Sequence, residues 1–191
     1  MKSKKLLKTS LFLSLLLTVS SMFSQNMMEK DTKMVGGAAM YPTKNIVENA
    51  VNSKDHTTLV AAVKAADLVD VLSSKGPFTV FAPTNEAFDK LPDGTVATLL
   101  KPENKMTLQS ILKYHVVPGK YSASKLMMLI KKGNGKAMLK TASGGMLTAW
   151  MKDGAVYITD ENGNSAKVTI ADVNQSNGVI HVVDSVLLPK S

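Results

Sequence analysis

Two apolar runs about a hundred residues apart constrain the fold of this chain more than any other part of its sequence. They lie within residues 76–88 and 177–189, and both are rich in β-branched and aromatic side chains. Each run is too apolar to face water on either side, and each is closed by turn residues and proline. We therefore expect two buried sheet strands at the core of one domain.

Apolar residues at helical spacing precede the first run. They recur over residues 46–51 and again over residues 59–66, where Thr57 or Thr58 is placed to cap the helix. After the run, Thr84 precedes a short helical pattern, and Pro102 begins a longer one that leads into a strand closed by Pro118. Several helices are therefore expected in the N-terminal half.

The last third of the chain changes to the alternating period of strands. Turn signals at residues 143–145, 153–154, 162–163 and 177–178 separate its apolar runs. Three of these signals are Asp-Gly or Asn-Gly pairs, which tolerate positive φ and favour tight hairpins. Helices followed by an antiparallel meander predict an α+β domain.

The two apolar runs and residues 112–119, Leu-Lys-Tyr-His-Val-Val-Pro-Gly, resemble the signature boxes and the Tyr-His motif of the fasciclin (FAS1) domain family. The resemblance extends over about residues 41–189. It implies the FAS1 fold, in which several N-terminal helices pack against an antiparallel β-sandwich or meander. It also implies a role in cell-surface or matrix interaction, such as adhesion or biofilm association, and no catalysis. In this family the pair corresponding to Tyr114 and His115 is tied to adhesion, although packing explains the same pair.

The N-terminal residues have the pattern of a secretory signal peptide. Four lysines precede a short apolar stretch and then small residues, and the stretch is too short to span a membrane. We expect a signal peptide over residues 1–24, a flexible leader over 25–40 and a single domain over 41–191. The protein is then secreted, to the periplasm or beyond, and its formal charge falls from +8 to about +4.

No residue pattern predicts a catalytic, metal or cofactor site. The three histidines have no metal-binding spacing, and the chain has no cysteine. His181, Asp184 and Ser185 invite comparison with a catalytic triad, but along a strand His181 and Asp184 point to opposite faces. The segment beginning at Asp160 starts like a calcium loop and then departs from it, so a solvated hairpin turn is the better interpretation.

A long stretch without acidic residues is the clearest binding signal. Between Glu103 and Asp153 the chain has nine lysines and no acid. Such a stretch can form a surface for acidic polysaccharide or another protein, or simply a solvated face. Nucleic acid is not expected, because every basic residue is lysine and the protein is exported. The candidate polyanion-binding residues are Lys120, Lys125, Lys131, Lys132, Lys136 and Lys140.

The alternative function is a periplasmic carrier of a small apolar ligand. Its motivation is the methionine-rich segment near Trp150, since methionine lines adaptable pockets. Core packing accounts for the same residues. The sequence leaves open the binding partner and the oligomeric state.

Overall fold

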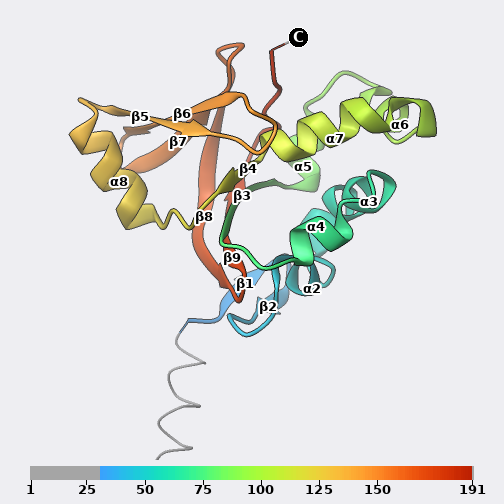
Figure 1. Cartoon of the computed structure of the whole chain (residues 1–191), viewed down its shortest axis with the longest axis horizontal. Helices are drawn as coiled ribbons and strands as arrows, with labels where there is room; N and C mark the ends of the chain where they lie inside the picture. Colours follow the sequence, from blue (N-terminus) through green and yellow to red (C-terminus); the bar gives the residue numbers. More distant parts are fainter. Residues whose placement is uncertain (1–30, 191) are drawn as a thin grey trace, which may run out of the picture.

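The computed structural model describes residues 31–190, and the two apolar runs lie side by side as the second and third strands of its larger sheet (Figure 1). Over these residues the sheet has seven strands in the order β4-β3-β9-β8-β7-β6-β5. Its pairs are antiparallel except the parallel pair β3 and β9. The strands are β3 (Phe78–Pro83), β4 (Val116–Pro118), β5 (Lys136–Lys140), β6 (Met146–Lys152), β7 (Ala155–Thr159), β8 (Ser165–Gln175) and β9 (Gly178–Val183).

The parallel pair is buried on both faces. Every residue of β9 is buried, as is every residue of β3 after Phe78. The approach of the two strands requires glycine at position 178, because a Cβ there would lie 2.1 Å from the carbonyl oxygen of Phe78. The prediction of two buried core strands is therefore confirmed.

The central strands divide the interior into two apolar clusters. Val80 and Ile180 point into the cluster beneath the N-terminal helices. Phe81 and Val183 point into a second cluster, which the C-terminal strands share with α8. Side chains alternate along each strand, so one pair of strands supplies both clusters.

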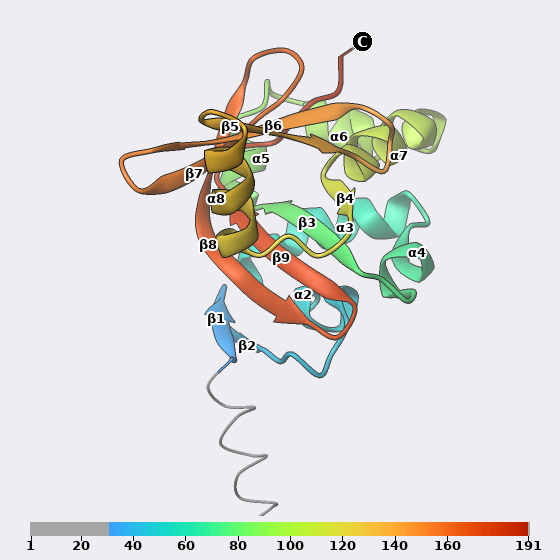
Figure 2. The ribbon, with the colours of Figure 1, turned by 60° about the vertical axis from the view of Figure 1, so that its left-hand side comes forward.

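Helices lie on both sides of the central strands. Figures 1 and 2 show α2–α7 gathered on one side and α8 beside β5 and β6. The α-helices are α2 (Ile46–Ala50), α3 (Thr57–Ala65), α4 (Val69–Ser73), α5 (Asn85–Asp89), α6 (Thr95–Leu99), α7 (Lys105–Tyr114) and α8 (Ala123–Lys132); the 3₁₀ turns are η1 (Lys54–His56) and η2 (Pro102–Asn104).

The C-terminal half is the predicted antiparallel meander. All four turn signals fall between consecutive strands from β5 to β9. The sheet nearly closes on itself, since the amide of Ala142, just after β5, donates to the carbonyl of Val116 in β4 at 2.7 Å. The predicted α+β fold is confirmed. Helix α8 was not predicted; Ser122 caps it by accepting from the amide of Lys125.

The expectation of a flexible leader is wrong for residues 33–40. They form a two-stranded hairpin of β1 (Lys33–Val35) and β2 (Ala38–Met40), whose end residues Val35 and Met40 are buried in the first cluster. Only a few apolar side chains alternate there, so the sequence pattern was too short to detect. The predicted signal peptide, residues 1–24, and residues 25–30 lie outside the described residues.

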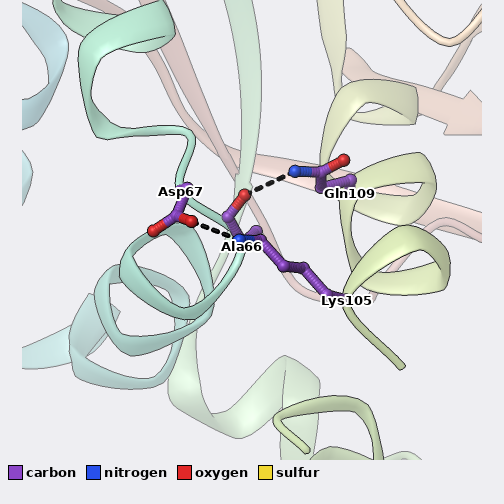
Figure 3. Close-up of polar contacts among 4 residues, drawn as sticks. All are labelled: Ala66, Asp67, Lys105 and Gln109. Carbon is purple, nitrogen blue, oxygen red and sulfur yellow. Dashed lines mark hydrogen bonds and ion pairs between the residues drawn. The ribbon is translucent and has the colours of Figure 1, made fainter. Parts of the chain in front are cut away.

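Polar contacts fix α7 against the end of α3 (Figure 3). The side-chain amide of Gln109 donates to the carbonyl of Ala66 at 2.7 Å, and Lys105 forms an ion pair with Asp67. The backbone of Asp67 is left-handed, at φ +52°, where the chain turns out of the helix. These contacts hold α7 in place, and α7 in turn positions the Tyr-His pair at its end.

Candidate binding surfaces

Tyr114 is a buried cross-link between the end of α7 and the meander. Its hydroxyl donates to the carbonyl of Met146 at 2.8 Å and accepts from the amide of Glu161 at 3.0 Å. Burial raises the pKa of Tyr114 to about 12. With no exposed surface, the side chain ties two strand ends to the helix.

His115 joins α7 to the C-terminal segment. Its Nδ1–H donates to the carbonyl of Ile111 at 2.9 Å, and its Nε2 accepts from the amide of Leu187, 72 residues away, at 3.0 Å. These partners require the neutral ring, and burial lowers the pKa of His115 to about 4. Because Tyr114 and His115 are both buried, a partner can touch them only if the structure opens locally.

His181 is also a buried, hydrogen-bonded residue of the sheet. Its Nδ1 accepts from the amide of Asp172 at 3.3 Å, and its Nε2–H donates to the carbonyl of Tyr121 at 2.7 Å. Burial lowers the pKa of His181. The carboxylate of Asp184 instead accepts from the amide of Lys167 and the hydroxyl of Ser185. The ring of His181 therefore bonds to the backbone of Asp172 and Tyr121, while Asp184 and Ser185 bond to each other.

Asp160 organises the turn between β7 and β8. The sequence predicts a solvated turn, but Asp160 is only 5% exposed. One carboxylate oxygen accepts from the amides of Asn162 and Asn164, both at 2.9 Å, and the other accepts from the amide of Leu188 at 3.1 Å. The carboxylate thus secures the C-terminal segment. Within residues 31–190, no group of three His, Asp or Glu residues is placed to hold a metal ion.

The six candidate lysines are all exposed, but they divide between two faces. Lys136 and Lys140 lie on the side of β5 that points away from the interior. Helix α8 packs against the opposite, inner side through Leu126 and Ile130, so its own lysines point outward in another direction. The group on α8 and the loop before it consists of Lys120, Lys125, Lys131 and Lys132.

The sheet adds residues to the β5 group that the sequence analysis did not select. Register pairing places Lys136 opposite Trp150, Trp150 opposite Tyr157, and Tyr157 opposite Lys167. Lys152 shares their face, two residues after Trp150. The alternation of the strands and the positions of the hairpin turns can both be read from the sequence. Pairing the predicted strands through those turns would have placed these residues on one face.

An apolar cavity of about 90 Å³ lies beneath the N-terminal helices. Val35, Val63 and Val182 are among the residues that line it. His56 also lines it; its Nδ1 is 2.9 Å from the hydroxyl of Ser53, and its ring also interacts with the backbone of Ala82. Burial lowers the pKa of His56. The methionines that motivated the carrier hypothesis lie elsewhere: Met127, Met128, Met138 and Met151 are exposed, and Met146 does not line the cavity.

Most of the described residues match a known protein family. A family model for the fasciclin domain matches residues 54–189. The chain belongs to the fasciclin domain family. The sequence resemblance that rested on the two strands and the Tyr-His motif is therefore confirmed.

This fasciclin domain has relatives in bacteria and animals. It is 51% identical over 156 residues to protein sll1483 of Synechocystis, covering 82% of this chain and 79% of that protein. It is 35% identical over 149 residues to transforming growth factor-beta-induced protein ig-h3 of Sus scrofa, covering 78% of this chain but 20% of the relative. A FAS1 domain pair from the insect cell adhesion molecule Fasciclin I has the same fold, with a TM-score of 0.69 at 19% identity over 82% of this chain and 57% of that one.

The fasciclin match covers both lysine groups but begins after the hairpin β1–β2 and helix α2. Those two elements form part of the cavity wall, through Val35, Met40 and Ile46. Within the described residues, no helix is both long and apolar enough to cross a membrane.

Proposed function

We propose that this fasciclin domain is a secreted, non-enzymatic protein that attaches to cell surfaces or extracellular matrix by binding acidic polysaccharide. Family membership supports an interaction role, since a solved relative is described as a cell adhesion molecule. The observation that carries the proposal is the exposure of all six candidate lysines in a segment that has no acidic residue. The site of action is the periplasm or the outside of the cell.

The binding would be electrostatic and weak for each molecule. Exposed ammonium groups attract an anionic surface with about 1 kcal/mol each, and salt screens this attraction over about 10 Å. One domain offers no avidity of its own, so firm attachment requires many copies or several contacts along one polymer. Tyr114 and His115 support such a surface by fixing the meander to α7.

The test is binding of the purified protein to immobilised alginate at low and at physiological salt. Replacing Lys131, Lys132, Lys136 and Lys140 by Gln removes charge from both lysine groups, and we expect binding at low salt to fall by about tenfold or more. Replacement of Lys54 and Lys64, which lie on the helical side, by Gln is the control. Unchanged binding in the fourfold variant contradicts the proposal.

The carrier of a small apolar ligand is a second candidate, because the cavity beneath the N-terminal helices supports it. An engineered apolar cavity of about 150 Å³ accepts benzene, so a volume of about 90 Å³ fits a smaller molecule. The imidazole of His56 lines this cavity and would contact the single polar group of such a molecule. Titration with ethanol, followed by methyl NMR, should shift the methyl signals of Val63 and Val182 in the wild type. In a cavity-filling Val63→Phe variant the Val182 methyl signals should not shift. Unshifted wild-type methyls would remove this candidate.

A further inference from the structure

The outward side of strands β5–β8 is a continuous surface built by four neighbouring strands. We call it the outer sheet face. Its opposite side is sealed by residues such as Leu147 and Ile158, which have no exposed surface. The outer sheet face consists of Lys136, Met138, Lys140, Met146, Thr148, Trp150, Lys152, Ala155, Tyr157, Thr159, Ser165 and Lys167.

A row of two aromatic rings between two lysines crosses the centre of this face. The rings of Trp150 and Tyr157 stack, with centroids 4.9 Å apart and planes inclined by 24°. Lys136 flanks Trp150 on one side, and Lys167 flanks Tyr157 on the other. Strands are spaced by about 4.8 Å, so the two lysines are about 14 Å apart at the backbone. The row thus places one positively charged side chain at each end of the pair of aromatic rings.

A second row, next to the first, carries hydroxyl groups. It runs from Thr148 to Thr159 and Ser165 across three strands. The indole N–H of Trp150 donates to the hydroxyl of Thr159 at 2.8 Å, and that hydroxyl lies 2.7 Å from the hydroxyl of Ser165. These contacts fix the indole ring and leave a line of polar atoms beside it.

The net charge of the outer sheet face is positive. Lys136, Lys140, Lys152 and Lys167 contribute four charges, and none of the twelve residues that form the face is acidic. Within residues 31–190, the acidic residues that border it are Asp153 and Glu161 in the turns and Asp184 beside Lys167. The centre of the face therefore attracts anions, and its borders limit where they bind.

We propose that the outer sheet face is a binding platform for acidic polysaccharide, in which sugar rings pack against Trp150 and Tyr157 while lysines hold the carboxylates. This inference rests on the proposed function and locates it on one of the two lysine groups. Sugar rings have apolar C–H faces that pack on aromatic rings, hydroxyls that pair with threonine and serine, and, in uronates, charges for lysine. The face offers all three kinds of group in adjacent rows. Helix α8 and its loop carry four lysines, as the outer sheet face does, but no stacked ring pair is found on that side within the described residues. Tyr121, the aromatic residue there, packs against the second cluster and lies under the ammonium of Lys125, 4.1 Å from the ring centroid.

The occupant is a sugar chain rather than a simple polyanion, because an anion without sugar rings would gain nothing from contact with the aromatic row. A polyphosphate chain would use the lysines alone and would bind α8 as readily as the sheet. A neutral glycan would use the rings alone. Only an acidic polysaccharide uses the charges and the rings together, so the two kinds of substitution must both weaken it.

The experiment measures binding of alginate oligosaccharide and of polyphosphate to three variants by isothermal titration calorimetry. The platform-charge variant replaces Lys136, Lys152 and Lys167 by Gln. The matched control replaces Lys125, Lys131 and Lys132 of α8 by Gln, removing the same charge. The ring variant is Trp150→Leu, which keeps an apolar side chain but removes the ring, and its melting temperature confirms folding.

For alginate we expect the platform-charge variant to lose about tenfold or more in affinity, the ring variant to lose about threefold to tenfold, and the α8 control to lose less than threefold. For polyphosphate, the ring variant should bind as the wild type does. Equal alginate losses in the two lysine variants, with no loss in the ring variant, overturn the platform while leaving the proposed function standing. Failure of the wild type to bind either polymer overturns the proposed function itself.

If Trp150→Leu does not fold, the comparison of the two lysine variants still decides, because all six substituted side chains are exposed. Loss confined to the platform-charge variant then supports the assignment. Equal losses in both overturn it.

Discussion

At the residue scale, the buried polar side chains of this fasciclin domain act as cross-links between distant segments. His115 connects α7 to the C-terminal segment at Leu187, and Tyr114 connects α7 to both Met146 and Glu161. In each of these hydrogen bonds the partner is a backbone N–H or C=O group, which would otherwise be unpaired. Loss of one side chain therefore leaves a buried donor or acceptor without a partner, which costs more than the bond itself contributes.

His115→Ala should lower the free energy of unfolding by about 2–4 kcal/mol, because it leaves the amide of Leu187 unpaired and opens a cavity. Urea denaturation measures the change, and the exposed substitution Lys131→Gln is the control. We expect any polysaccharide binding to fall with the folded population. Loss of binding at an unchanged stability would show that His115 contacts the partner directly.

Tyr114→Phe removes only a hydroxyl and should cost about 1–3 kcal/mol, since the carbonyl of Met146 and the amide of Glu161 lose their partner. Tyr157→Phe makes the same chemical change on the half-buried outer sheet face and should alter stability by less than about 0.5 kcal/mol. Thermal melts of the two variants give the comparison. Equal shifts in melting temperature would contradict the cross-link.

At the element scale, the hairpin β1–β2 is part of the packed domain. Val35 and Met40 pack in the cluster that includes Ile46 and Leu59, and the amide of Lys54 donates to the carbonyl of Gly36 at 3.1 Å. Gly36 itself is at φ +57°, and a Cβ there would lie 2.4 Å from the hydroxyl oxygen of Ser53. The hairpin is therefore fitted closely against η1.

Met40→Ala should lower the free energy of unfolding by about 2–4 kcal/mol through the cavity it leaves. Met34→Ala is the matched control, because Met34 is 61% exposed whereas Met40 is 2% exposed. Its effect should lie within about 0.5 kcal/mol. If the two variants unfold at the same urea concentration, the hairpin does not contribute to the core in solution.

The elements predicted from sequence are those whose pattern is local and repeated. The two buried strands and the four turns were predicted because β-branched runs, three Asn-Gly or Asp-Gly pairs and one Ser-Gly-Gly run act through short-range sterics. Helix α8 was not predicted because its apolar stripe is narrow: among the described residues of the helix, Leu126 and Ile130 alone are buried. The hairpin β1–β2 was not predicted because its burial depends on helices that lie further along the chain.

The candidate site follows the same rule. The lysines were visible as a stretch free of acid, but their division between α8 and β5 depends on which side of each element faces the core. Trp150, Tyr157 and Lys167 come together only through strand register, which links positions up to seventeen residues apart along the chain. Sequence alone shows the charge and leaves its arrangement open.

At the scale of the whole molecule, three neutral histidines link stability to pH. Burial lowers the pKa of His56, His115 and His181 below the ordinary value of 6.5. Below pH 6.5 these histidines are therefore protonated in the unfolded chain but remain neutral in the folded protein. His115 remains neutral in the folded protein down to about pH 4. Full stability is present above pH 6.5 and is lost as the pH falls.

His115 alone should reduce the free energy of unfolding by about 2 kcal/mol between pH 7.5 and pH 5. Urea denaturation at several pH values measures the slope. A His115→Gln variant, which starts from a lower stability, should lose less on acidification because one buried imidazole is gone. A wild-type stability that stays constant from pH 7.5 to pH 5 would contradict the buried, neutral histidines.

The central claim is that acidic polysaccharide binds on the outer sheet face, and the chain contains its own reporter. Trp150 is the only tryptophan of the 191 residues, so intrinsic tryptophan fluorescence arises from the middle of the platform. Titration of the wild type with alginate oligosaccharide at low salt should change the Trp150 emission in a saturable way, and added salt should reverse the change. Alginate binding observed by calorimetry under the same conditions, with no change in Trp150 emission, would contradict the assignment.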